Sequence, residues 1–370
     1  MKIEYDKDLA LMNTFGMKVS CACYVEFSSE DELSDIFRNM GRYGFPQPFL
    51  HIGGGSNLLF TRDFPGTVFH SAIRFIRRVD ARQGDSGLKA SSGAAGRPGS
   101  VLVEAGSGVL WDDFCAWCAG EGLWGPENLS GIPGEAGAAA VQNIGAYGVE
   151  VKDMVREVRC FDVVTGEIRP LHVKDCRYGY RDSIFKDTAK GRYVVTSVVF
   201  ALSSVPQPRL EYGHVRSAVE QALSSSGAGP EVSLCPSLVR DVILGIRGSK
   251  LPDPAVAGNA GSFFKNPVVP RSSYDIVENY AKSRYGADYE VPHFDAGSGF
   301  IKIPAAWLIE QCGWKGYREG NVGVYEKQPL VLVNVTGKAS PDEVVALEHK
   351  IVMSVQNLFG ITLHPEVEHV

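Results

Sequence analysis

The stretch GNAGSFFKNP, from Gly258 to Pro267, places one hydroxyl, that of Ser262, after three small residues and before two phenylalanines. Glycine lets a backbone come close to a ligand without a side chain in the way. A catalytic hydroxyl that must approach one atom of a ligand needs such surroundings, and an ordinary turn needs less. Taken alone, the motif is equally compatible with a turn residue and with a catalytic hydroxyl at Ser262. We expect Phe263 and Phe264 to anchor the loop by burial.

Two glycine-dense segments could hold a phosphate-bearing ligand. HIGGGSNLLF (51–60) exposes consecutive backbone N–H groups after an apolar run, and Ser56 and Asn57 add further donors. It is neither GxGxxG before a helix nor a P-loop with GK[ST], so a tight turn is the alternative. ENLSGIPGEAGAAAVQNIGAYG (127–148) contains five glycines and little charge, which suits close backbone approach to a flat cofactor or a small-residue helix packed on another helix. Together the two segments favour a nucleotide cofactor.

Two charged side chains, Arg181 and Glu366, are candidates for binding or catalysis. CRYGYRDSIFK (176–186) contains Tyr180 and Arg181, and an arginine fork can bind a carboxylate or phosphate in bidentate fashion. Alone, such an arginine is more often a structural ion-pair partner. Glu366, in LHPEVEHV (363–370), lies four residues before the last residue of the sequence. We therefore expect little backbone to anchor it from that side.

Composition excludes several classes of protein. The 370 residues predict two or more domains, and 44% hydrophobic with 22% charged residues indicates a globular chain. A net charge of −6 argues against a nucleic-acid binder. The longest apolar runs are too short for a membrane helix, and the acidic start shows no secretory signal, so we expect a cytoplasmic protein without a membrane partner. The CxxC at Cys115 and Cys118 has no second CxxC, so we expect buried free thiols and no metal site.

The elements that must position these residues alternate between strands and helices. We expect strands at 18–27 and 193–203, a helix at 28–44, a hairpin turning at 165–166, and helices at 237–250 and from Ser340 onward. A Gly/Ser/Ala-rich segment at 80–100 predicts a flexible insertion. The pattern predicts a mixed α/β or α+β protein in two units, with a boundary near residue 203.

Six motifs in order resemble one family. They are NTFGM (13–17), IGGGSN (52–57), IPGEAGAAAVQNIGAYGVE (132–150), YGYRDSIFK (178–186), KLPDP through GNAGSFFKNP (250–267) and LHPEVE (363–368). The chain thereby resembles the UDP-N-acetylenolpyruvoylglucosamine reductases, flavoenzymes that complete UDP-N-acetylmuramate for peptidoglycan. LEYGHV (210–215) resembles the tyrosine-bearing substrate loop of one form of this family.

The resemblance implies an α+β fold. Residues 1–203 would form a two-lobed FAD-binding domain of the vanillyl-alcohol-oxidase (PCMH) type, with lobes at about 1–72 and 73–203. Residues 204–370 would form an α+β substrate-binding domain whose C-terminal tail returns to the active site.

The resemblance also implies the reaction. NADPH would reduce a non-covalent FAD and leave, and UDP-N-acetylglucosamine enolpyruvate would bind in its place. Flavin N5 would deliver hydride to the vinyl carbon, and Ser262 would protonate the resulting enolate. A serine hydroxyl donates usefully only to so basic a centre. Arg181 and Glu366 would flank the substrate carboxylate and enolate, with Glu366 protonated there or helping to reprotonate Ser262.

The resemblance also implies, position by position, which residues bind the cofactor and the substrate. The expected cofactor-binding residues are Gly53, Gly54, Gly55, Ser56, Asn57, Ile132, Pro133, Gly134, Gly137, Ala138, Asn143, Gly145, Ala146 and Tyr147. The expected substrate-binding residues are Tyr180, Tyr212, Lys250, Asn266, Lys315 and Gln328. VPHFDAGSGF (291–300) lacks the additional tyrosine that we would look for there. We expect a monomer that binds a sugar nucleotide and NADPH, although no residue by itself selects NADPH over NADH.

Two alternatives stay open. One is another PCMH-type FAD oxidoreductase, such as a hydroxy-acid or aldonolactone oxidase, in which FAD is often covalently attached. The other is a flavin-binding or sugar-nucleotide-binding protein without catalysis, although Ser262, Arg181 and Glu366 are all present.

Overall fold

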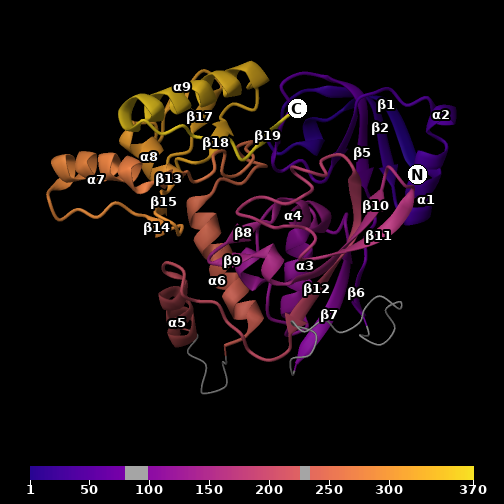
Figure 1. Cartoon of the computed structure of the whole chain (residues 1–370), viewed down its shortest axis with the longest axis horizontal. Helices are drawn as coiled ribbons and strands as arrows, with labels where there is room; N and C mark the ends of the chain where they lie inside the picture. The colour runs from indigo at the N-terminus through magenta and orange to yellow at the C-terminus, as the bar shows by residue number, and fades with distance from the viewer. Residues whose placement is uncertain (80–98, 226–233) are drawn as a thin grey trace. The chain divides into compact units, whose positions relative to one another are not determined.

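A computed structural model describes residues 1–79, 99–225 and 234–370 (Figure 1). These residues divide into two compact units. Unit 1 comprises Met1–Lys7, Cys21–Gly54 and Pro65–Ser249, and unit 2 comprises Asp8–Ser20, Gly55–Phe64 and Lys250–Val370. Both units mix helices and strands, as the sequence predicts. Of the insertion expected at 80–100, residues 80–98 lie outside the described ranges.

Unit 1 is built on two sheets. The strands of the first are β1 (Lys2–Asp8), β2 (Ser20–Phe27), β3 (Phe49–Ile52) and β5 (Phe64–Ser71), in the order β1-β2-β5-β3. The strands of the second are β6 (Ile76–Val79), β7 (Ser100–Gly106), β10 (Val155–Asp162), β11 (Glu167–His172) and β12 (Tyr193–Ser203), in the order β11-β10-β12-β7-β6. A short hairpin joins β8 (Gly145–Ala146) to β9 (Val149–Glu150).

Helices α1 (Glu30–Arg38), α2 (Met40–Tyr43), α3 (Trp111–Gly120) and α4 (Ala136–Gln142) pack on these sheets. Helices α5 (Val215–Ser225) and α6 (Pro236–Lys250) pack on one another and on Trp124. Short 3₁₀ turns lie at Glu127–Leu129 and Val151–Asp153. Trp111 and Phe114 of α3 pack with Phe200 of β12 in the core of the second sheet. Phe37 of α1 packs on Phe69 of β5 and on Phe161 of β10, so α1 shares a core with both sheets.

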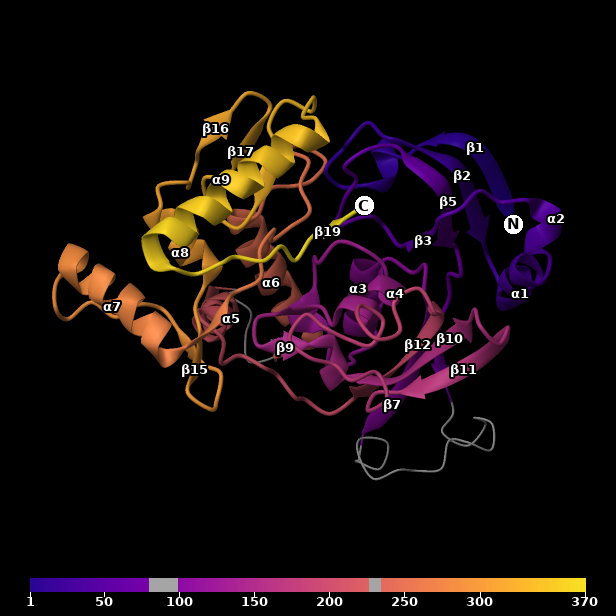
Figure 2. The ribbon, with the colours of Figure 1, turned by 45° about the horizontal axis from the view of Figure 1, so that its top comes forward.

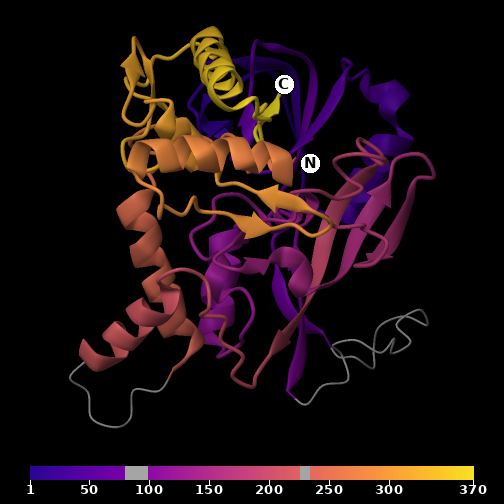
Figure 3. The same ribbon diagram turned by 60° about the vertical axis from the view of Figure 1, so that its left-hand side comes forward.

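Unit 2 combines small sheets with three helices (Figure 2). Its strands are β4 (Leu58–Leu59), β13 (Val268–Pro270), β14 (Phe294–Asp295), β15 (Phe300–Lys302), β16 (Arg318–Glu319), β17 (Val322–Val324), β18 (Leu332–Asn334) and β19 (Glu368–His369). Its helices are α7 (Arg271–Tyr285), α8 (Ala305–Gln311) and α9 (Pro341–Phe359), with a 3₁₀ turn at Ala10–Met12. Figure 3 shows α7 beside the β14–β15 hairpin.

Most element predictions agree with the structure. The hairpin at 165–166 joins β10 to β11, and α9 begins at a Ser340 capping box. The single helix expected at 28–44 is instead two helices that meet at Asn39. Cys115 and Cys118 are buried free thiols, as expected. No helix among the described residues is long and apolar enough to cross a membrane.

The expectation that little backbone anchors Glu366 from its C-terminal side is wrong. Residues after Glu366 form β19, which pairs in parallel with β4. The N–H and hydroxyl of Thr61 both donate to the carbonyl of Val370, at 2.8 and 2.7 Å. The sequence did not reveal this because the partner strand lies some 300 residues earlier in the chain.

Candidate functional site

The two predicted glycine segments contact one another in unit 1. A Cβ atom built on Gly53 would lie 3.1 Å from the Cβ of Ala138 and 3.1 Å from Oε2 of Glu135. A Cβ on Gly54 would lie 3.5 Å from the Cα of Gly134. Strand β3 delivers the first segment, and the turn before α4 delivers the second. The structure therefore brings together two segments that the sequence only suggested as separate parts of one cofactor site.

These segments fit a phosphate-bearing cofactor. Within the described ranges, the N–H groups of Gly54 and Gly55 donate no hydrogen bond to the protein. Backbone N–H groups in such a glycine loop suit phosphate oxygens. Gly137 has another role in packing, because its Cβ would lie 2.7 Å from the Cβ of Ser107. The small-residue helix considered from sequence is therefore present as α4, next to the glycine loop.

A buried ion pair lies beside this glycine loop. His70 of β5 is 4% exposed, and its Nε2 lies 2.9 Å from Oε1 of Glu135, which is also 4% exposed. Nδ1 of His70 lies 3.3 Å from Oε2 of Glu26. Burial disfavours the charged imidazole, but the hydrogen bond and negative charge of Glu135, helped by Glu26, outweigh it and raise the pKa of His70. A protonated His70 would neutralise a carboxylate that would otherwise repel a bound phosphate.

Arg181 is held by the second glycine segment. Its guanidinium donates to the carbonyl of Gly145 and, at 3.4 Å, to that of Asn143. Asn143 Nδ2 also donates to the carbonyl of Gly179, two residues before Arg181, at 2.8 Å. A Cβ on Gly145 would lie 2.7 Å from Arg181 Nη1, so only glycine leaves room for the guanidinium. One predicted catalytic residue is thus fixed by two predicted cofactor-binding residues. The expected substrate residue Tyr180 lies next to it, with the guanidinium 5.4 Å from its ring.

Tyr212 lies against the end of the same segment. Its ring meets that of Tyr147 edge-on, with centroids 6.2 Å apart. Tyr147 and Tyr212 line a shallow, open depression together with Gly148, Arg209 and Glu211. Tyr212 is 47% exposed, so its face is available to a ligand.

In unit 2, buried neighbours hold Ser262 at the surface. Phe263 and Phe264 are 0% and 1% exposed, which confirms that they anchor the loop, whereas Ser262 is exposed. In the described part of the chain, no group bonds to the Ser262 hydroxyl. The glycine at 258 serves a different purpose from the one expected. A Cβ there would lie 2.2 Å from the carbonyl oxygen of Phe15, so Gly258 lets the loop pack on the NTFGM segment.

The Ser262 loop pairs with the tail that carries Glu366. The N–H of Glu366 donates to the carbonyl of Phe263 at 2.8 Å, and the N–H of Lys265 donates to the carbonyl of His364 at 2.9 Å. Asn57 Nδ2 donates to the carbonyl of Glu366 at 3.1 Å. Two predicted catalytic residues and one predicted cofactor residue therefore lie on adjoining segments of unit 2.

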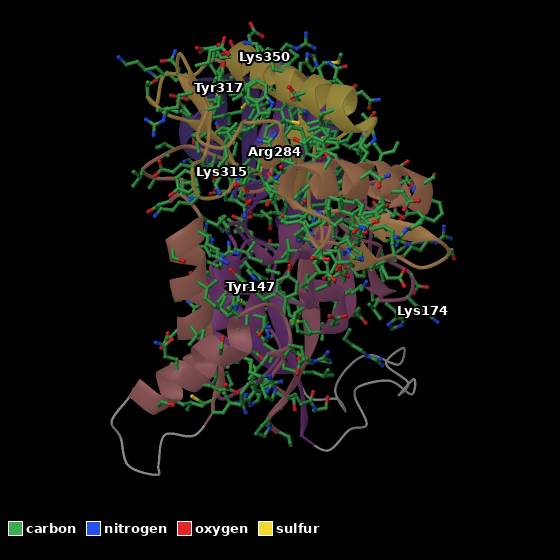
Figure 4. The ribbon with its side chains drawn as sticks, turned by 90° about the vertical axis from the view of Figure 1, so that its left-hand side faces the viewer. Tyr147, Lys174, Arg284, Lys315, Tyr317 and Lys350 are labelled. Carbon is green, nitrogen blue, oxygen red and sulfur yellow. The ribbon has the colours of Figure 1, made fainter. Side chains whose placement is uncertain are left out.

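The remaining predicted substrate residues are spread over unit 2. Lys250 is exposed, and the exposed Lys315 pairs with Glu310 at 2.7 Å (Figure 4). Oδ1 of Asn266 accepts from the N–H of Ala305 at the start of α8, at 2.9 Å. Gln328 begins a turn whose Leu330 carbonyl accepts from the N–H of Phe263 at 2.7 Å. Gln328 therefore lies in the turn that supports the Ser262 loop.

The other predicted cofactor-binding residues are likewise divided between the two units. Ile132, Pro133 and Ala146 belong to the second glycine segment in unit 1. Ser56, between Gly55 and Asn57, belongs to unit 2. Sequence reasoning missed His70 and Glu135. The charge of Glu135 in an almost uncharged tract was the available signal, but nothing in the sequence pairs it with a strand residue 65 positions away.

Comparisons with known proteins agree across the whole chain. Family models match residues 253–370, as the C-terminal domain of UDP-N-acetylenolpyruvoylglucosamine reductase, and residues 21–171, as an FAD-binding domain. The chain is 43% identical over 369 residues to the UDP-N-acetylenolpyruvoylglucosamine reductase of Bacteroides fragilis (strain YCH46), covering 100% of both chains. It is 42% identical over 369 residues to that of Chromobacterium violaceum, covering 99% of this chain and 98% of the relative.

A solved structure shares the fold. The crystal structure of UDP-N-acetylenolpyruvylglucosamine reductase from Thermus caldophilus matches with a TM-score of 0.63 and 20% identity, over 100% of this chain and 99% of the other. With the two family models, this similarity confirms the predicted α+β fold, with an FAD-binding domain and a C-terminal domain of this reductase type.

Proposed function

Because the chain belongs to the UDP-N-acetylenolpyruvoylglucosamine reductase family, we propose that it reduces UDP-N-acetylglucosamine enolpyruvate to UDP-N-acetylmuramate with electrons from NADPH. The full-length similarity at 43% identity carries this proposal. The FAD-binding domain accounts for the electron carrier. Within the units, the paired glycine segments and the pairing of the Ser262 loop with the Glu366 tail support it.

The cofactor site would use the first unit's glycine segments and the donors that follow them. The Gly54 and Gly55 N–H groups would bind the pyrophosphate, and Ser56 and Asn57 would add side-chain contacts. FAD, when bound, supplies transfer of two electrons as hydride, from NADPH and then to the substrate's vinyl carbon. His70 would keep Glu135 from repelling the phosphates. The glycines would let the backbone approach the cofactor closely.

The protonation step would belong to three side chains. Hydride addition to the vinyl carbon leaves negative charge on the neighbouring carbon and its carboxylate, and Arg181 would stabilise that charge. Ser262 would give its proton to the carbon, for which its exposed hydroxyl is suited. Glu366, protonated, would hydrogen-bond the substrate carboxylate or return a proton to Ser262. In the overall reaction, one NADPH and one proton are consumed for each substrate molecule reduced.

The remaining assignments follow from the same family. Tyr180, Tyr212, Lys250, Asn266, Lys315 and Gln328 would bind the substrate. The side chains of Lys250 and Lys315 would be attracted to its pyrophosphate, since both are exposed cations. We also propose that the enzyme acts in the cytoplasm as a monomer, with two domains that divide near residue 203, although packing groups residues 204–249 with unit 1.

One anaerobic spectral experiment tests the function. Purified yellow protein should lose its flavin absorbance on addition of NADPH and recover it on addition of UDP-N-acetylglucosamine enolpyruvate. Absence of recovery would overturn the proposal and favour a binding protein. FAD that stays attached after denaturation would favour a PCMH-type oxidase. Repeating the reduction with NADH measures the nicotinamide preference.

A further inference from the structure

His369 links the C-terminal tail to helix α9. Its Nε2 lies 2.8 Å from Oε2 of Glu348, a residue of α9 that is only 7% exposed. A buried carboxylate is costly unless it is paired. Among the described residues, His369 is the only group that bonds this carboxylate. The pair is therefore a specific attachment of the tail rather than a chance surface contact.

The same imidazole touches the loop of Ser262. Its ring meets the ring of Phe263 edge-on, with centroids 5.9 Å apart and planes at 79°. Phe263 follows Ser262 directly, and its carbonyl accepts from the N–H of Glu366. One side chain thus contacts both the helix and the loop, three residues after Glu366.

Backbone bonds hold this tail on both sides of Glu366. The N–H of Glu366 donates to Phe263, and the N–H groups of Glu368 and Val370 donate to Asn57 and Leu59. β19 and β4 are two-residue strands, paired in parallel through Glu368–Leu58 and His369–Leu59. So short a ladder contributes few hydrogen bonds, and chain ends held by few contacts fray. The side chain of His369 adds what this ladder does not provide, a bond from the tail to α9.

We propose that His369 and Glu348 form a positioning pair that fixes the Glu366 tail against the Ser262 loop for the protonation step. This inference rests on the roles proposed above for Ser262 and Glu366. Neither His369 nor Glu348 touches the reacting atoms. They act because a reacting group displaced by about 1 Å can lose about 100-fold in rate.

The pair depends on pH. The hydrogen bond and charge of Glu348 raise the pKa of His369 above its ordinary value, against the opposing effect of burial. At low pH His369 is therefore protonated and forms a charged pair with Glu348. The charged pair is lost as the pH rises through the pKa of His369 in the folded protein. The charged or titratable side chains on the elements around His369 are as follows: Asp342, Glu343, Glu348, His349 and Lys350 on α9; His364, Glu366 and Glu368 on the tail; and Lys265 on the Ser262 loop; β4 carries none.

The test uses holoenzyme reduced beforehand by NADPH, mixed anaerobically with UDP-N-acetylglucosamine enolpyruvate. For His369→Ala, we expect the maximal rate of flavin reoxidation to fall about 10- to 100-fold, while the half-saturating substrate concentration changes little. His369→Phe keeps a ring on Phe263 but removes the bond to Glu348, so it should also be slow. Flavin reduction by NADPH should be unchanged in both variants.

Glu348→Gln provides the conservative variant. It keeps a hydrogen bond to the imidazole but removes the charge that raises the pKa of His369. We expect near-normal reoxidation at pH values below the ordinary pKa of histidine, and loss of rate at a lower pH than in the wild type. Lys350→Ala is the matched control on the same helix (Figure 4). It breaks the exposed Lys350–Glu319 pair, 2.6 Å long, and should leave the rate and pH profile unchanged.

A wild-type maximal rate in both His369 variants would overturn this inference and leave the proposed function standing. An unchanged pH profile in Glu348→Gln would do the same. If His369→Ala failed to retain FAD or to fold, His369→Phe and Glu348→Gln would decide the matter. Wild-type holoenzyme that is reduced but never reoxidised by the substrate would instead overturn the proposed function.

Discussion

Ser262 shows how a single hydroxyl is presented by its neighbours. Two buried phenylalanines follow it, and the backbone of the second half of the loop is bonded to Leu330, His364 and Glu366. These bonds leave the serine exposed on a loop that cannot move far. Of the small residues before it, Gly258 has a more ordinary origin, because the carbonyl of Phe15 occupies the space of a side chain there.

Removing this hydroxyl should separate the two half-reactions. Ser262→Ala should leave flavin reduction by NADPH intact and slow substrate-driven reoxidation by about 100- to 10,000-fold, the usual range for a lost general acid. Stopped-flow absorbance at the flavin band measures both steps. Ser272→Ala, at an exposed serine of α7, is the control. Equal losses in both half-reactions would contradict the role of proton donor.

Gly145 offers a test of Arg181 that leaves the arginine in place. In Gly145→Ala the new methyl group would lie 2.7 Å from Nη1 of Arg181, so the guanidinium must move. We expect reoxidation by the substrate to slow by about 10-fold or more, with flavin still bound.

The control for this substitution is Gly245→Ala, on α6 of the same unit, where a Cβ would have no neighbour within 4 Å. It should keep full activity and stabilise the protein by about 0.5–1 kcal/mol, since alanine favours a helix interior. Unchanged reoxidation in Gly145→Ala would mean that the position of Arg181 does not limit the reaction.

At the scale of elements, strands and helices position groups that the motifs alone do not connect. His70 stands beside Ile52 in the pairing of β5 with β3, and Ile52 leads directly into the glycine loop. Glu135 stands at the start of α4. The contact between His70 and Glu135 therefore joins the sheet, the glycine loop and the helix. The charges of these two side chains should influence any phosphate bound nearby.

The His70–Glu135 pair predicts a pH dependence. Because the pKa of His70 is raised, the stabilisation from its charged pair with Glu135 is complete below the ordinary histidine pKa, near 6.5. That stabilisation is lost as the pH rises through the pKa of His70 in the folded protein. FAD affinity should weaken over the same rise, since Glu135 is no longer neutralised. Fluorescence titration of apoprotein with FAD at several pH values measures this.

Breaking the pair should cost stability. His70→Ala leaves a buried carboxylate without its imidazole and should lower the free energy of unfolding by about 3 kcal/mol, measured by urea denaturation. His172→Ala, at a partly exposed histidine of β11, is the control and should change little. The assignment of the pH effect to His70 fails if His70→Ala keeps the wild-type pH dependence of FAD affinity.

At the scale of the whole molecule, the units do not follow the order of the chain. Unit 2 takes in Asp8–Ser20 and Gly55–Phe64 besides the C-terminal part. The proposed catalytic residues are divided as well, with Arg181 in unit 1 and Ser262 and Glu366 in unit 2. Both units are therefore needed for the proposed reaction.

Removing FAD should destabilise the protein as a whole. A ligand that binds only the folded state, present at 100 times its dissociation constant, adds about 2.7 kcal/mol to the free energy of unfolding. Thermal unfolding of apoprotein with added FAD should therefore show a higher Tm than without it. Riboflavin should raise it less, because it lacks the diphosphate that the glycine loop is proposed to bind. Equal effects of the two would argue against that role of the loop.

The sequence by itself determined the family, the two glycine segments, most helices and strands, and the burial of Phe263 and Phe264. These features depend on local composition, spacing and motif order, which a linear sequence carries directly. Only the tertiary structure decided that Gly258 packs on Phe15, that His70 pairs with Glu135, and that β4 and α9 hold the tail of Glu366. Each of these joins residues far apart in the chain, and no local pattern specifies which distant group will satisfy a buried charge or an unpaired strand edge.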